Sequence, residues 1–320
     1  MFDWLTEFVD HLITEFTQLP WPPGTILTFD HTVRALLAIF FVCLICGAMG
    51  ALVVGNRMAF FSDALAHCAF AGVALGLILG LAVGGAVDQR TITLVMVLFG
   101  ILMGVLIAFV REKTNLANDT VIGVFYAAAV GLGAVFMRWG AGQRQLRSIE
   151  AFIFGDPNTA QTWEILLLAA LAAGTIVFLL WFYNPLVMAS ANASLALSRR
   201  VPVRLCQYLL IILLGIMVNL SIQIVGALLI NGLLIVPAAA AANLARNLRQ
   251  MFWYAVLLAL VSGIGGYLLH WEVNCRTPDR WHIGTSGCIV VLAVLFFVAS
   301  MLAGRWLHSA PQGESASAPD

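Results

Sequence analysis

The feature that most constrains this chain is a series of apolar stretches, each close to 20 residues long and separated by short polar segments. A helix of this length spans a hydrocarbon core about 30 Å thick. Hydrophobic residues make up 62% of the chain and charged residues 10%, which is typical of a multi-pass membrane protein. Nine stretches can be drawn, at about 35–54, 60–81, 91–110, 120–137, 163–183, 204–222, 224–244, 251–269 and 286–304. The sequence therefore predicts an all-α polytopic membrane protein with eight or nine transmembrane helices, since two stretches could be re-entrant or merged.

Three regions are predicted along the chain. Residues 1–33 form an N-terminal interfacial helix and a linker, because apolar residues from Leu5 to Leu19 recur at helical spacing opposite a set of acids. Residues 34–308 form the transmembrane domain. Residues 309–320 are small and polar, so a disordered tail is expected.

The distribution of basic residues favours a cytoplasmic C-terminus and an external N-terminus. Cytoplasmic loops carry an excess of Lys and Arg. This orientation places nine basic residues inside, namely Arg57, Arg111, Lys113, Arg199, Arg200, Arg204, Arg246, Arg249 and Arg305. Seven then lie outside, namely Arg34, Arg90, Arg138, Arg144, Arg147, Arg276 and Arg280.

A carboxylate and an imidazole interrupt the apolar stretch that follows Arg57. Asp63 and His67 are four residues apart, so they lie about 40° apart on one face of a helix. His67 is ten residues beyond Arg57, or roughly 15 Å into the membrane at 1.5 Å per residue. Ionisable side chains at this depth are costly and are functional by default. The pair is therefore a candidate metal or ion site; the alternative is a structural pair bonded to itself or to a neighbouring helix.

The opposite face of the same helix is built for packing. Gly72, Gly76 and Gly80 repeat every four residues, and such a ridge lets another helix approach closely.

A second informative stretch covers residues 224–250. Pro237 removes a helical hydrogen bond and is predicted to break or kink the segment, while Gly226, Asn231 and Gly232 are predicted to loosen it. Interrupted helices are tolerated at membrane depth where they border a cavity. We therefore expect Asn231, and Asn219 and Gln223 just before it, to line a pathway; interhelical hydrogen bonding is the alternative for the latter two.

Several functions lack support in the sequence. It contains no GxxxxGK[ST], HExxH or GxSxG, so we expect neither ATP hydrolysis by this chain nor a membrane hydrolase. A net charge of zero and the lack of a long basic run give no support for nucleic acid as a partner.

Cys43 and Cys46 lie within an apolar stretch and are interpreted as packing residues. Cys275 and Cys288 flank a polar loop and could pair, which the sequence leaves open.

Three stretches resemble the permease subunits of bacterial ABC transporters for zinc, manganese and related divalent metals. GALVVGNRMAFFSDALAHCAFAGVALG resembles the arginine turn and Asp-x-x-x-His helix of that family. ANDTVIGVFYAAAVGLG resembles its Asp-Thr stretch, which would put Asp119 on the pathway. VGALLINGLLIVPAAAAANLARNLRQM resembles its proline-centred C-terminal signature.

The resemblance implies a homodimeric pore in the bacterial cytoplasmic membrane, served by a separate cytoplasmic ATP-binding subunit and an extracytoplasmic metal-binding protein. Asp63 and His67 would be the pore site, occupied in passing by Zn²⁺ or Mn²⁺, with no permanently bound cofactor. A cytoplasmic coupling helix would contact the ATPase through Ala191, Asn192, Ala193, Ser194, Leu195, Ala196, Leu197, Ser198, Arg199 and Arg200. The runner-up function is a stand-alone secondary cation transporter or channel that uses the same pair. A membrane enzyme with the pair as acid and base lacks a third catalytic group.

Overall fold

The computed structural model describes residues 3–20, 25–82, 89–114, 116–140, 155–191, 196, 198–199, 202–276 and 283–308. Its long helices are α1 (Asp3–Thr17), α2 (Asp30–Gly55), α3 (Ala59–Ala82), α4 (Gln89–Lys113), α5 (Asn118–Gly140), α7 (Thr162–Ala191), α9 (Val203–Val225), α10 (Ala227–Leu244), α11 (Leu248–Arg276) and α12 (Thr285–His308). Short 3₁₀ turns lie at Ile26–Thr28 (η1) and Pro157–Thr159 (η3). Within these ranges, nine helices are long and apolar enough to cross a membrane, which confirms the predicted fold class.

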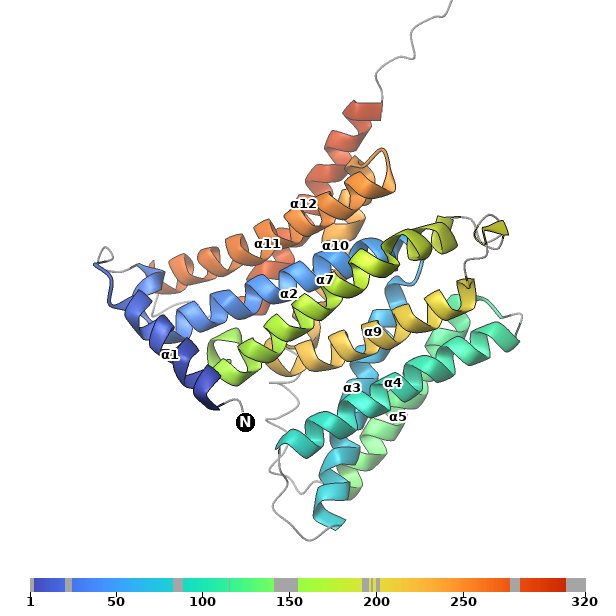
Figure 1. Cartoon of the computed structure of the whole chain (residues 1–320), viewed down its shortest axis with the longest axis horizontal. Coiled ribbons are helices and arrows are strands. Elements are labelled where there is room, and N and C mark those ends of the chain that lie inside the picture. The colour runs from blue at the N-terminus through green and yellow to red at the C-terminus, as the bar shows by residue number, and fades with distance from the viewer. Residues whose placement is uncertain are drawn as a thin grey trace, which may run out of the picture.

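The spanning helices fall into two packed groups that meet along a central row. Helices α10, α11 and α12 pack on one another, and α10 and α11 also pack on α2, while α3 packs on α4 and α5. Figure 1 shows α11 and α12 on one side, α3, α4 and α5 on the other, and α2, α7 and α9 between them. Below, the outer side of this bundle means the side where α2 begins, following the predicted orientation.

Small residues bring the helix backbones close together. A Cβ added to Gly72 would lie 2.8 Å from Cα of Met96, and one added to Gly76 would lie 3.1 Å from Cα of Ile92, so α3 lies directly against α4. A Cβ on Gly50 of α2 would lie 2.2 Å from the carbonyl oxygen of Leu234 in α10. Since apolar burial gives little drive for association inside lipid, this close packing is what holds such helices together.

Cysteines contribute to the same packing. Cys43 and Cys46 are fully buried on α2, as predicted, and Cys43 fills the space beside Gly263 of α11. Cys275 and Cys288 are free thiols here, one exposed and the other buried.

The interruption before α10 lies at Gly226 and not at Pro237. Gly226 has φ 86°, a conformation that costs glycine little, and it separates α9 from α10. Pro237 lies inside α10, which stays helical from Ala227 to Leu244, so the predicted break at the proline is wrong in position. Transmembrane helices tolerate proline because neighbouring groups satisfy the freed carbonyl.

A segment from the other half of the chain covers this interruption. Gly155 has φ 59°, and a Cβ there would lie 2.3 Å from the carbonyl carbon of Val225, so the two backbones are in direct contact. The Tyr267 hydroxyl of α11 donates to Oδ1 of Asn158, 2.7 Å away, and holds the segment in place. Backbone therefore packs on backbone above the start of α10.

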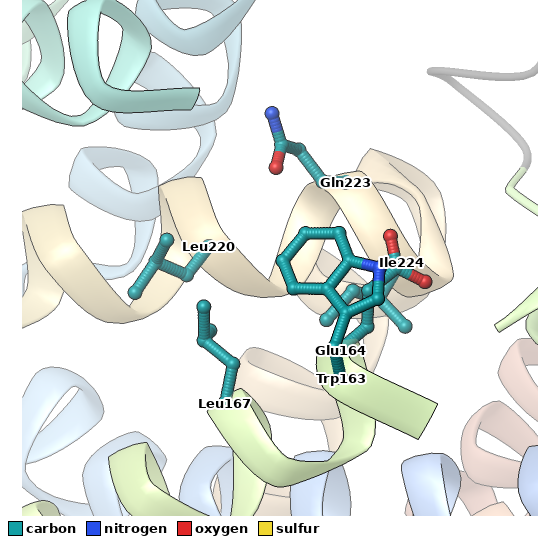
Figure 2. Close-up of a pocket in the computed structure, with 6 residues that line it drawn as sticks. All are labelled: Trp163, Glu164, Leu167, Leu220, Gln223 and Ile224. Atoms are coloured by element: carbon teal, nitrogen blue, oxygen red, sulfur yellow. The ribbon is translucent and has the colours of Figure 1, made fainter. Parts of the chain in front are cut away.

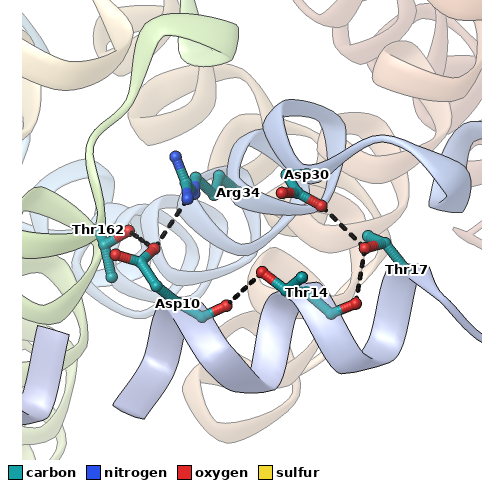
Figure 3. A network of polar contacts seen from close by, with 6 residues as sticks. All are labelled: Asp10, Thr14, Thr17, Asp30, Arg34 and Thr162. Carbon is teal, nitrogen blue, oxygen red and sulfur yellow. Dashed lines mark hydrogen bonds and ion pairs between the residues drawn. The ribbon is translucent and has the colours of Figure 1, made fainter. Parts of the chain in front are cut away.

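Helix α1 is joined to the outer ends of α2 and α7 by polar contacts. Arg34 of α2 donates to Asp10 across 2.8 Å, and the Thr162 hydroxyl donates to the same carboxylate oxygen (Figure 3). Thr17 donates to Asp30 across 2.8 Å. Asp10 therefore faces the protein, so the acids of α1 do not all lie on one solvated face. The exposed apolar side chains include Trp4, and the placement of α1 at the membrane surface stays a prediction.

Candidate functional site

Asp63 and His67 lie in the first half of α3 and share one face of it. The distance between Nδ1 of His67 and Oδ1 of Asp63 is 3.8 Å. Both side chains are partly open, with 39% of the Asp63 side chain and 37% of the His67 side chain exposed in the single chain. The pair therefore opens onto a surface of the chain.

The hydrogen bonds of His67 leave one ring nitrogen suited to a metal. Nδ1 lies 3.0 Å from the main-chain carbonyl oxygen of Asp63, one helical turn earlier. A carbonyl oxygen can only accept, so we assign the ring proton to Nδ1. Nε2 then carries the lone pair. Histidines that ligate metals commonly donate their second ring N–H to a carbonyl or carboxylate in this way, which fixes the tautomer and the ring orientation.

Tyr126 of α5 covers that lone pair. Its hydroxyl lies 3.4 Å from Nε2 of His67, a long hydrogen bond, and the two ring centroids are 4.5 Å apart. This residue was missed by the sequence analysis. It lies in the stretch around Asp119 that carries the family resemblance, but nothing in its spacing indicates that α5 packs on α3.

Asn231 of α10 covers the carboxylate. Its Nδ2 donates to Oδ1 of Asp63 across 2.8 Å, whereas its own Oδ1 is buried and meets no donor among the described residues. A Cβ on the neighbouring Gly232 would lie 2.6 Å from Cγ2 of Val290 in α12, so α12 fixes this part of α10. Asn231, predicted to line a pathway, thus meets Asp63.

The depth of the cluster can be estimated against α2. Gly50 approaches Leu234 and Ala238 of α10. Helices α2 and α10 are the first and the seventh of the candidate spans among the described residues, so alternating spans cross the membrane in the same direction. Asn231 is therefore level with about residue 45 of α2, roughly 15 Å from the inner end of that helix at 1.5 Å per residue. Along α3, Asp63 and His67 lie about 6 and 12 Å from the inner end of the helix, so the polar cluster of Asp63, His67, Tyr126 and Asn231 lies within the membrane span, with His67 and Asn231 nearest its middle.

The other predicted pathway residues are not part of this cluster. Asn219 is fully buried against Gly100 of α4 and donates to the main-chain oxygen of Gly215 across 2.6 Å. Gln223 accepts a hydrogen bond of 2.9 Å from Thr93 of α4. Asp119 is exposed in the first turn of α5.

Gln223 also lines a small cavity between α7 and α9. The cavity measures about 10 Å³ and is bordered by Trp163, Glu164, Leu167, Leu220, Gln223 and Ile224 (Figure 2). A volume of this size admits one water molecule at most.

The coupling segment can be followed only in part. Of the ten residues from Ala191 to Arg200, the structure describes Ala191 as the end of α7, Ala196 as buried, and Ser198 and Arg199 as exposed. The others, and the tail 309–320, lie outside the described residues.

No group of three His, Cys, Asp or Glu side chains comes together in the described part of the chain. One Asp and one His cannot by themselves complete a four-coordinate shell. Any ion held here needs further ligands, from Asn231, water or a second chain.

A multi-pass helical bundle that keeps a carboxylate and an imidazole within the membrane span has the architecture of a membrane transport protein. Residues 28–304 match the model of the ABC 3 transport family, and the chain belongs to this family. It is therefore a membrane-spanning permease subunit of an ABC transporter, in the cytoplasmic membrane. Such subunits work with an ATP-binding subunit and a substrate-binding protein.

Individual relatives agree with this placement. The chain is similar to the high-affinity zinc uptake system membrane protein ZnuB of Haemophilus influenzae, with 27% identity over 273 residues, 85% of this chain and 97% of ZnuB. It is also similar to the manganese import system permease protein ScaB of Streptococcus parasanguinis, with 26% identity over 296 residues, 92% of this chain and 94% of ScaB. PsaBC from Streptococcus pneumoniae, solved in complex with Fab, superposes with a TM-score of 0.72 at 24% identity, covering 95% of this chain and 100% of that chain. At this identity the structural likeness shows the fold alone.

Proposed function

We propose that this chain is the permease of an importer for divalent metal ions, zinc or manganese, and that Asp63 and His67 are its intramembrane ligands. Hydrolysis of ATP on a separate subunit drives the transport. A metal-binding protein outside the cytoplasmic membrane delivers the ion. The relatives named for zinc and for manganese uptake support the substrate class.

One observation carries the site assignment. Nε2 of His67 and the carboxylate of Asp63 lie on one helix face within the membrane span, and the bond from Nδ1 to a main-chain oxygen orients the ring so that Nε2 is held only by a long contact with the Tyr126 hydroxyl. Imidazole nitrogen suits zinc and other borderline metals, and carboxylate oxygen suits manganese as well.

A second copy of the chain completes the site in this proposal. More than a third of each side chain is exposed, and a carboxylate facing lipid at this depth is costly. A two-fold dimer with these faces around its axis would cover both pairs and supply two carboxylates and two imidazoles. Such a shell could close around an ion and open again, which a transport site requires for release.

The ATP-binding subunit would control this opening through the segment from Ala191 to Arg200. The segment follows α7 and precedes α9, and α9 packs on α3 and α4. A movement of this segment can therefore be transmitted through α9 to α3, the helix that carries Asp63 and His67. Closure of the ATP-binding subunits would bring the two pairs together or move them apart.

The decisive experiment is ATP-dependent uptake of Zn²⁺ and Mn²⁺ into vesicles that hold the reconstituted complex. Asp63→Ala and His67→Ala are expected to reduce uptake to the level of vesicles without the chain. Glu7→Ala and His11→Ala remove the same groups from exposed positions of α1 and should leave uptake unchanged. Near-normal uptake by the Asp63 and His67 variants at normal expression would defeat the assignment. Uptake without ATP would favour a secondary transporter.

A further inference from the structure

The carboxamide of Asn231 is satisfied at one end only. Its nitrogen donates to Asp63 across 2.8 Å, while its oxygen is buried and has no donor among the described residues. A buried carbonyl oxygen without a partner is uncommon and needs a physical reason. Here the charge of Asp63 supplies one, because a bare carboxylate attracts the NH₂ end of the amide and repels the oxygen.

A bound cation reverses that preference. Rotation of the terminal torsion of Asn231 by about 180° exchanges the nitrogen and the oxygen without moving the helix, since this torsion is broad and nearly two-fold. Once a divalent ion lies on the Asp63 carboxylate, the NH₂ end faces a positive charge and the oxygen becomes the favoured end. An amide oxygen is a regular ligand of hard divalent cations.

We propose that Asn231 is a ligand of the transported ion: its Oδ1 joins Asp63 and Nε2 of His67 when metal enters, and its NH₂ group holds Asp63 when the site is empty. This inference rests on the proposed function of the Asp63–His67 pair. The set offered by one chain is then a carboxylate oxygen, an imidazole nitrogen and a neutral amide oxygen.

The position of Asn231 gives this ligand a second consequence. Asp63 and His67 belong to α3, which packs on α4 and α5. Asn231 belongs to α10, which packs on α12 through its own Gly232 and on α2 through Gly50 of that helix. An ion bound by all three residues therefore connects the two groups of helices. A neutral oxygen also holds the ion less tightly than a second carboxylate would, because ligand charge sets affinity, and this favours release.

Tyr126 provides a contrast within the same cluster. Its hydroxyl covers Nε2 of His67 as Asn231 covers Asp63. The hydroxyl proton of Tyr126 must move away from Nε2 before a metal ion can bind there, and the neutral phenol oxygen is itself a poor ligand. Removal of a group that only competes with the ion should tighten binding. Removal of a ligand should weaken it. The sign of the change therefore separates the two roles.

The test is equilibrium binding of Mn²⁺ alone and of Zn²⁺ alone to the full chain, purified with its ATP-binding subunit in lipid nanodiscs. Free Mn²⁺ is followed by electron paramagnetic resonance, and Zn²⁺ by competition with a fluorescent chelator. The variants are Asn231→Ala, Asn231→Leu, which keeps most of the volume, Asn231→Asp, which restores an oxygen, and Asp63→Asn. Thermal unfolding of each variant reports whether the fold is intact.

We expect Asn231→Ala and Asn231→Leu to weaken binding of both metals by ~10–100-fold, at least the loss seen when a metal site is deprived of a supporting residue. Asn231→Asp should bind as tightly as the natural chain or more tightly. Unchanged or tighter binding by the Ala and Leu variants overturns the proposal, since Asn231 would then only compete for Asp63. If Asp63→Asn also binds normally, the site itself lies elsewhere, and the proposed function fails along with this inference.

Discussion

Replacement of Gly50 by alanine tests whether α2 and α10 are in backbone contact. The added Cβ would lie 2.2 Å from the carbonyl oxygen of Leu234, about 1.2 Å short of the 3.4 Å where ordinary contact begins. The obstacle is backbone, so no side-chain rotation relieves it and the helices must separate. Overpacking of this kind costs about 1–3 kcal/mol.

Gly55→Ala is the matched control on the same helix. A Cβ there meets nothing within 4 Å. Gly50 is in the interior of α2 and gains helix propensity of up to about 1 kcal/mol on replacement by alanine, whereas Gly55 is the last helical residue and gains less, so part of the steric cost is offset. We therefore expect Gly50→Ala to be less stable than Gly55→Ala by about 1–2 kcal/mol, which is roughly 5- to 30-fold in the unfolding equilibrium.

The measurement is unfolding of the full chain by SDS titration in mixed micelles, followed by tryptophan fluorescence. Separation of α2 from α10 also displaces Asn231, so Gly50→Ala should lower metal uptake as well, whereas Gly55→Ala should not. Equal stability of the two variants would refute the close approach of Gly50 in α2 to Leu234 in α10, and with it the depth assigned to Asn231.

Three further outcomes follow from the contacts described above. Gly72→Ala should lower the free energy of unfolding more than Gly76→Ala does, because the new Cβ would lie 2.8 Å rather than 3.1 Å from the nearest α4 backbone atom. The same SDS titration ranks the two variants, and the reverse order would contradict this packing. Tyr126→Phe keeps the ring beside His67 and removes the hydroxyl, so Mn²⁺ should bind more tightly in the resonance assay; weaker binding would make the hydroxyl part of the site. Asp10→Asn should weaken the ion pair with Arg34 that joins α1 to α2, by about 1 kcal/mol or less. Amide hydrogen exchange in α1 should become faster, and metal uptake should not change. Unchanged exchange would show that apolar contacts alone hold α1 in place.

Local regularities in the sequence were enough to predict the spans and the central pair. Each spanning helix carries its own hydropathy signal, and the four-residue spacing of Asp63 and His67 places both on one face whatever surrounds them. The small face containing Gly72 and Gly76 could likewise be read from one helix alone, and it lies against α4.

The surroundings of the pair could not be predicted, because they depend on which helices become neighbours. Tyr126 is 59 residues from His67 along the chain, and Asn231 is 168 residues from Asp63. Asn219 and Gln223 carry polar groups much like that of Asn231, yet both face α4. The sequence favours a break at Pro237, because proline is a strong local signal, and only a loosening at Gly226; in the structure Gly226 takes the positive φ and separates two helices, whereas Pro237 lies inside α10.

The 168 residues between Asp63 and Asn231 also bear on how the protein is made. A ribosome that adds about 5–20 residues per second needs roughly 8–34 s to reach the second partner after the first. Both residues leave the ribosome with the same delay after they are added, so for about as long α3 is outside the ribosome while its carboxylate lacks the amide that will hold it. The nascent chain must therefore rely on the insertion machinery to shield Asp63 until the seventh spanning helix arrives.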